Sequence, residues 1–194
     1  MTGEPQPTDE AARDAGRASR SAVVLIGLRG AGKTTVGRAI AARLGTSFVD
    51  TDTLIAEQAG LSIAEIFAAE GEAGFRRRER ETIAAIVKGA PGVVSVGGGA
   101  VLDADNVKRL GELGKIVWLT APPNVLWERV SSDSSTADTR PALTDRSGVK
   151  ELEHLSRRRA GGYAVAADLA VDTAGKSPET VAGEILAWMC RQAD

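Results

Sequence analysis

The sequence predicts an α/β protein in which three layers, helix, sheet and helix, surround a central and mostly five-stranded parallel sheet. Short apolar runs such as Val23 to Ile26 are typical of strands that are buried on both faces. These runs alternate along the chain with segments of helical periodicity, a pattern that favours a doubly wound sheet. Because 194 residues suit one such domain with an appended segment, we expect a single domain over residues 21–194.

The first elements of this domain are a strand, a helix and a second strand. The helix is expected from Thr34 onward, where apolar residues recur with the spacing of one helix face. Residues 47–50 are then expected to form a short strand. Alternation along that strand, if it continues, would place the carboxylates of Asp50 and Asp52 on the same side.

Local signals mark the elements that follow. Ser62 and Glu65 have the spacing of a capping box, which predicts a short helix that ends near Gly71. A longer helix is expected over residues 72–88, before Pro91. The remaining expected elements are strands at 93–96, 116–119 and 168–171, and helices that begin near Pro122, cover 148–159 and follow Pro178.

Composition restricts the class of protein. Residues 1–20 are small, polar and charged, so we expect them to form a disordered N-terminal tail. A net charge of −2 argues against a surface that binds nucleic acid or anionic lipid. The single cysteine, Cys190, excludes an intrachain disulfide. No apolar run has the length of a membrane span or of a signal-peptide core, and the expected location is therefore the cytoplasm.

Residues 131–147 stand out because they are polar and show no periodicity. A loop of this length inside a compact domain usually has a function. We therefore expect it to be a mobile lid.

A phosphate-binding motif lies between the first strand and the first helix. Residues 27–34 read GLRGAGKT and satisfy G-x-x-x-x-G-K-[ST] in the strand-to-helix context that the motif requires. The glycines let backbone N–H groups approach an anion, and the start of the helix adds a positive dipole end. Lys33 can reach the outer phosphates and the Thr34 hydroxyl can hold Mg²⁺. The alternative is a glycine-rich turn whose lysine faces solvent.

The motif alone leaves kinases, GTPases, motor-like ATPases and nucleotide-binding proteins open. No strand ends in the Asp-Glu pair of a motor-like ATPase, and no Asn-Lys-x-Asp segment is present to read guanine. Acidic and basic residues are instead placed where they can hold a small polar acid. The sequence therefore favours a small-molecule kinase.

One helix face carries candidate substrate-binding residues. Phe75, Arg76 and Glu79 share it, and a guanidinium fork matches a carboxylate through two hydrogen bonds. The alternative for this arginine-rich stretch is a solvated face with salt bridges. That alternative is preferred for Arg77 and Arg78.

Five segments together resemble shikimate kinase. They are GLRGAGKTT, DTD, EGEAGFRRRE, GGGAV and RPAL, and they follow that family's order and approximate spacing from residue 21 to the C-terminus. The resemblance implies a fold of the P-loop kinase type with a substrate-binding helical region over about 53–90. It also implies transfer of the γ-phosphate of ATP to the 3-hydroxyl of shikimate, with Mg²⁺ as the cofactor.

The resemblance assigns roles residue by residue. Asp52 is implied to orient the attacking hydroxyl and accept its proton, whereas a helix N-cap at Asp52 or Thr53 is the alternative. Arg159 aligns with a second carboxylate-binding arginine. The implied sets are Lys33, Asp52 and Arg140 for catalysis; Gly30, Ala31, Gly32, Lys33, Thr34, Thr35, Arg140 and Lys176 for ATP; Asp52, Phe75, Arg76, Glu79, Gly97, Gly98, Gly99 and Arg159 for the substrate; and Thr34 and Asp50 for the metal.

The chain departs from the family pattern in three places. Ala142 stands where the family generally has leucine, so it offers less apolar cover to a substrate ring. Gly161-Gly162 replaces the usual Pro-Leu and is expected to loosen the backbone after the second arginine. Lys176 stands where an arginine commonly lies against adenine, and Arg129 is another candidate for that contact.

Other functions remain open at this stage. The scaffold also suits a kinase of another small metabolite, such as gluconate or a nucleoside monophosphate. A nucleotide-binding regulator without turnover is a further alternative. In each case we expect a monomer that binds neither nucleic acid nor a membrane.

Overall fold

The computed structural model describes residues 22–89, 91–132 and 148–193. The expected tail over 1–20 lies outside these residues, as do positions 133–147 of the expected lid, including Arg140 and Ala142. Ser131 and Ser132, which the sequence placed in that lid, form the end of helix α6 (Pro123–Ser132).

A five-stranded sheet occupies the centre of the fold, in the order β2-β3-β1-β4-β5, and every neighbouring pair is parallel. Residues 23–26 of β1, the middle strand, are fully buried, as expected for a strand covered on both faces. The predicted parallel sheet is therefore confirmed. The strands are β1 (Ala22–Ile26), β2 (Phe48–Asp50), β3 (Val93–Ser95), β4 (Gly114–Thr120) and β5 (Leu169–Asp172).

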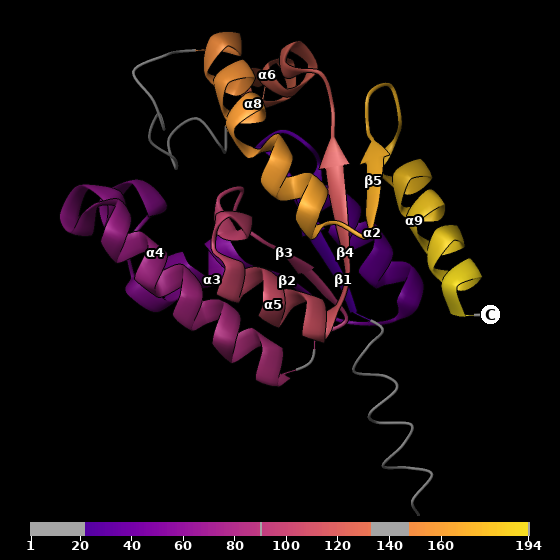
Figure 1. Cartoon of the computed structure of the whole chain (residues 1–194), viewed down its shortest axis with the longest axis horizontal. Helices are drawn as coiled ribbons and strands as arrows, with labels where there is room; N and C mark the ends of the chain where they lie inside the picture. The colour runs from indigo at the N-terminus through magenta and orange to yellow at the C-terminus, as the bar shows by residue number, and fades with distance from the viewer. Residues whose placement is uncertain (1–21, 90, 133–147, 194) are drawn as a thin grey trace, which may run out of the picture.

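Helices cover both faces of the sheet, which gives the three predicted layers (Figure 1). Helices α2 (Lys33–Leu44) and α9 (Pro178–Ala193) pack together on one face. Helices α5 (Ala104–Leu113) and α8 (Val149–Ala166) cover the other face, and α4 (Ile63–Gly89) packs against α5. None of the helices in the described part of the chain combines the length and the apolar composition that a membrane crossing needs.

The long helix α4 contains the predicted break. Ser62 N–H donates to Glu65 at 2.7 Å and Glu65 N–H donates to the Ser62 hydroxyl at 3.2 Å, so the capping box is present. Gly71 has φ +68° and ψ −176°, a conformation that a residue with a side chain rarely adopts. The chain therefore bends at Gly71 between two helical stretches.

Three sequence expectations differ from the structure. Strand β2 ends at Asp50 and helix α3 (Thr51–Ala59) begins at once, so Asp52 lies in a helical turn and not on an extended strand. The N-cap of α3 is Asp50, not Asp52 or Thr53, because the Asp50 side chain accepts from the next N–H groups. Helix α5 was not foreseen. Its N-cap is Asp103, and it is strongly amphipathic.

Candidate functional site

The candidate site lies at the edge where the parallel strands end. The phosphate-binding loop follows β1, Asp50 ends β2, and three glycines follow β3. Because the carboxyl ends of parallel strands meet at one edge of the sheet, these segments lie together there. The arrangement places an anion-binding loop next to acidic and basic side chains.

Three glycines shape the phosphate-binding loop. Gly27, Gly30 and Gly32 have φ values of +140°, +79° and +89°, which favour glycine over any other residue. Lys33 Nζ donates to the carbonyl oxygens of Gly27 at 2.9 Å and Leu28 at 3.1 Å. The ammonium group is thereby held across the loop, where it faces any phosphate that the loop binds.

Thr34 and Asp50 offer oxygen ligands beside the loop. The Thr34 hydroxyl donates to Asp50 Oδ2 at 3.1 Å, while Asp50 Oδ1 accepts from the N–H groups of Asp52 and Thr53. Mg²⁺ is usually held by one or two protein oxygens together with water and substrate phosphates. Within the described ranges, no group of three or more His, Cys, Asp or Glu side chains could hold a metal. The pair fits a nucleotide-bound Mg²⁺ and not an all-protein metal cage.

A cleft of about 590 Å³, part of it open to solvent, adjoins this loop. The expected substrate-binding residues Asp52, Phe75, Arg76, Glu79, Gly97, Gly98, Gly99 and Arg159 all line the cleft, together with Leu28, Arg29, Ile63, Phe67 and Leu155.

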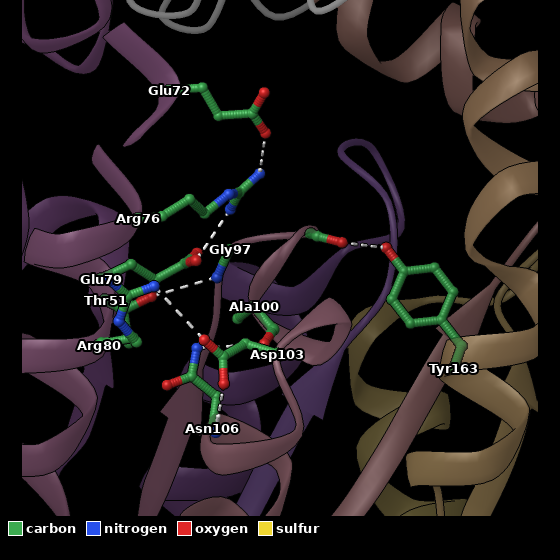
Figure 2. Close-up of polar contacts among 11 residues, drawn as sticks. Thr51, Glu72, Arg76, Glu79, Arg80, Gly97, Ala100, Asp103, Asn106 and Tyr163 are labelled. Atoms are coloured by element: carbon green, nitrogen blue, oxygen red, sulfur yellow. Dashed lines mark hydrogen bonds and ion pairs between the residues drawn. The ribbon is translucent and has the colours of Figure 1, made fainter. Parts of the chain in front are cut away.

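The Arg76 guanidinium is held by carboxylates on its own helix (Figure 2). Nη1 donates to Glu79 Oε2 at 2.8 Å and Nη2 donates to Glu72 Oε1 at 3.3 Å. Its Cζ lies 5.4 Å from the centre of the Phe75 ring, and that ring stacks on Phe67 with centroids 4.6 Å apart. A small apolar wall therefore supports a fixed cation at the cleft.

Burial and ion pairing act in opposite directions on the pKa values of Arg76 and Glu79. Glu79 is only 1% exposed, and burial raises its pKa above the ordinary value, helped by the charge of Asp52 and opposed by Arg76. For Arg76, burial disfavours the charged form, but Glu79 and Glu72 outweigh it, so the pKa of Arg76 is raised. The guanidinium consequently remains charged at any physiological pH.

The glycines after β3 allow these side chains to approach the backbone. A Cβ at Gly97 would lie 2.8 Å from both Asp52 Oδ1 and Glu79 Oε1, and a Cβ at Gly99 would lie 2.7 Å from Arg76 Cζ. Contacts this short do not occur with real Cβ atoms. A side chain at Gly97 or Gly99 would therefore force the carboxylates or the guanidinium to shift away from this turn.

The second arginine reaches the same turn from α8. A Cβ at Gly98 would lie 3.1 Å from Arg159 Nη1, and the Tyr163 hydroxyl donates to Gly98 O at 2.6 Å (Figure 2). Burial raises the pKa of Tyr163, against the opposing charge of Arg159. Gly161 and Gly162, where a looser backbone was expected, both lie inside α8, which runs on to Ala166. The buried Tyr163 anchors this stretch and offsets the low helix propensity of glycine.

The nucleotide-side candidates make different contacts. Arg129 donates to Gly30 O at 3.2 Å, to the Thr173 hydroxyl at 2.9 Å and to Thr173 O at 2.7 Å. It thus joins the phosphate-binding loop to the segment after β5. Lys176 pairs with Glu184 on α9 at 2.8 Å. A contact of Lys176 or Arg129 with adenine stays a prediction of the family resemblance.

Several cleft residues were missed at the sequence level. Ile63 and Phe67 lie four residues apart on one helix face, across the bend at Gly71 from the predicted Phe75, and that bend obscured the signal. Arg29 occupies a position that the motif leaves open. The one sequence feature that could have marked Arg29 as a cleft residue is its charge among the glycines and apolar residues of the loop.

Comparison with known proteins gives consistent results. The family model described as "Shikimate kinase" matches residues 29–190. A shikimate kinase of Moorella thermoacetica is 47% identical over 163 residues, 84% of this chain and 91% of the relative. One from Symbiobacterium thermophilum is 43% identical over 84% of this chain and 93% of the relative.

Solved structures agree with the sequence relatives. The shikimate kinase from Acinetobacter baumannii in complex with shikimate has a TM-score of 0.82 and 32% identity, covering 90% of this chain and 96% of that chain. A gluconokinase from Sinorhizobium meliloti has a TM-score of 0.53 and 19% identity, covering 90% and 94%. At this identity, the likeness to the gluconokinase shows a shared fold and nothing about the substrate.

Proposed function

The chain belongs to the shikimate kinase family, and we propose that it transfers the γ-phosphate of ATP to the 3-hydroxyl of shikimate. The observation that carries the proposal is the single cleft in which Asp52, Arg76, Arg159 and the three glycines meet beside the phosphate-binding loop. Those residue types suit a hydroxylated carboxylic acid. The products are shikimate 3-phosphate and ADP.

Two arginines bind the substrate carboxylate in this proposal. Arg76 and Arg159 both approach the glycine turn, and charge-assisted hydrogen bonds from a guanidinium to a carboxylate are strong and directional. Glu79 and Glu72 hold Arg76 in one orientation, which reduces the entropy lost on binding. Phe75 supports the guanidinium plane and offers a wall to the substrate ring.

Asp52 is proposed as the acceptor of the hydroxyl proton. As the hydroxyl oxygen forms its bond to the γ-phosphorus, the bond from that phosphorus to the β,γ-bridging oxygen breaks and ADP leaves. The hydroxyl proton passes to the Asp52 carboxylate. Its place in the first turn of α3, beside the cleft, orients the carboxylate toward the glycine turn.

The nucleotide phosphates bind along residues 30–35. The backbone N–H groups of the loop and the start of α2 favour negative charge, and Lys33 faces the outer phosphates. Thr34 and Asp50 would hold Mg²⁺, which supplies charge neutralisation at the phosphates. Arg140 stays a prediction of the family resemblance for the transferring phosphate, because it lies outside the described residues.

A coupled assay of ADP release tests the proposal. We expect turnover with shikimate and ATP, and background release with gluconate or without an acceptor. Turnover with gluconate alone would support the rival kinase. Nucleotide binding without turnover on any acceptor would support a regulatory protein and refute the proposal.

A further inference from the structure

We propose that the ion pair between Arg29 and Glu151 is a positioning element that sets helix α8, which carries Arg159, against the phosphate-binding loop. The inference rests on the proposed function. Arg29 Nη2 and Glu151 Oε2 form this pair, which joins positions 122 residues apart in the sequence. The two side chains are 14% and 2% exposed.

The loop motif does not require an arginine at this position. In G-x-x-x-x-G-K-[ST] the phosphates are bound by backbone N–H groups, the lysine and the hydroxyl, so the side chain of Arg29 has no role in the loop itself. Arg29 instead lines the substrate cleft, and its guanidinium pairs with Glu151 in the first turn of α8. The side chain of Arg29 thus joins the phosphate-binding loop to helix α8.

One row of residues on α8 explains why this contact matters. Glu151, Leu155, Arg159 and Tyr163 recur every fourth residue, and all four are buried. Such a row follows one face of a helix. Leu155 and Arg159 line the cleft, and they lie between the two ends of the row.

Both ends of this row are fixed. At one end Glu151 pairs with the phosphate-binding loop, and at the other Tyr163 donates to Gly98 O at 2.6 Å. The distance along the helix from Glu151 to Arg159 is about 12 Å at 1.5 Å per residue. Arg159 is therefore placed by two anchors, one on the nucleotide side and one on the glycine turn.

The chemistry of the pair supports positioning over simple stability. A buried ion pair contributes little net stability, and apolar residues of similar volume are often as stable. What an ion pair adds is a directional contact between fixed partners. Glu151 also complements the positive end of the helix dipole, so the carboxylate is held at the start of α8.

Two variants separate positioning from stability. Glu151→Gln keeps the shape and removes the charge, and the double variant Arg29→Met/Glu151→Met replaces the pair by apolar side chains, so it is expected to fold. Both are compared with Lys115→Met. That control breaks an ion pair with Asp168 near the start of β4, at the opposite edge of the sheet.

Steady-state kinetics with ATP and shikimate provide the readout, together with thermal unfolding. We expect the KM for shikimate to rise about tenfold in both variants, the size of a coupling between neighbouring charged groups. The KM for ATP should change by less than about threefold in Glu151→Gln. The control Lys115→Met should leave both the KM for shikimate and the KM for ATP unchanged.

The results distinguish this inference from the proposed function. If the unmodified chain does not turn over shikimate, the proposed function fails. If it does so and the double variant keeps the shikimate KM of the parent, the pair is only structural and the inference is overturned. An equal rise in the KM for shikimate and the KM for ATP in Glu151→Gln would also overturn the inference. Such a result would indicate a general effect on the phosphate-binding loop and not the positioning of α8.

Discussion

Replacing Arg76 with alanine tests the carboxylate-binding role most sharply. The change removes the guanidinium that lines the cleft and that Glu79 and Glu72 hold in place. The phosphate-binding loop keeps all of its own hydrogen bonds. The variant should therefore weaken the binding of shikimate and leave the binding of ATP unchanged.

The expected size follows from the hydrogen bonds between Arg76 and the substrate carboxylate that the variant removes. Two hydrogen bonds between charged groups contribute about 1.5 kcal/mol each at the lower end. Together they amount to about 3 kcal/mol, which corresponds to about a hundredfold rise in the KM for shikimate. The KM for ATP should stay within about twofold, because Lys33 Nζ donates to carbonyl oxygens of the loop, which the variant leaves in place.

Stability should also fall in Arg76→Ala, for a separate reason. Glu79 is 1% exposed, and breaking a buried pair from one side costs about 3–5 kcal/mol. That figure is an upper bound here, because Arg76 is 22% exposed and Glu79 can take up a proton at its raised pKa. The double variant Arg76→Ala/Glu79→Gln removes the uncompensated charge. It should recover part of the free energy of unfolding without recovering affinity.

The matched control is Arg77→Ala. Arg77 is 61% exposed and pairs with Glu70 at 3.4 Å, away from the cleft lining. ADP release would be measured against each substrate with the other saturating, and unfolding by thermal melts. A rise in both KM values by the same factor in Arg76→Ala, or a similar rise for shikimate in the control, would refute the reasoning.

Three further predictions follow from the geometry. Gly99→Ala should raise the KM for shikimate about as much as Arg76→Ala, since its Cβ would displace that guanidinium; an unchanged KM would contradict the close approach. Thr34→Val should raise the Mg²⁺ concentration that half-saturates turnover about tenfold, while a value equal to the parent's would remove Thr34 from the metal site. The pKa of Glu79 is raised above 4.5 by burial, so its stabilising contribution is present below about pH 4.5 and is lost as the pH rises through the folded pKa. The free energy of unfolding of the parent, measured in denaturant titrations relative to Glu79→Gln, should therefore fall as the pH rises. An increase with rising pH would show that the charge of Arg76 outweighs the effect of burial on the pKa of Glu79.

Features with strong local signals were predictable from the sequence. The phosphate-binding loop, the capping box at Ser62 and the bend at Gly71 each depend on residues only a few positions apart. Buried parallel strands also carry their own apolar pattern. These signals were sufficient to predict the layers of the fold, whereas most of the expected cleft residues came from the resemblance to shikimate kinase.

Features that depend on tertiary contacts were not predictable. One local feature was also missed: the alternation of Asp50 and Asp52 held only if the strand over 47–50 continued, whereas Asp50 caps a helix that begins at once. Helix α8 was expected to end near Arg159, yet Tyr163 anchors it to the glycine turn. The pairing of Arg29 across 122 residues has no local signature at all, because only the folded chain brings the two charges together.

The most direct test of the central claim is the identity of the product formed from ATP and shikimate. We would follow the reaction by phosphorus and proton NMR with the parent chain and with Asp52→Asn. The account predicts a single phosphate ester on the 3-hydroxyl of shikimate with the parent, and a rate lower by about a hundredfold or more with the variant. A phosphate on another hydroxyl, release of inorganic phosphate alone, or an equal rate with Asp52→Asn would contradict it.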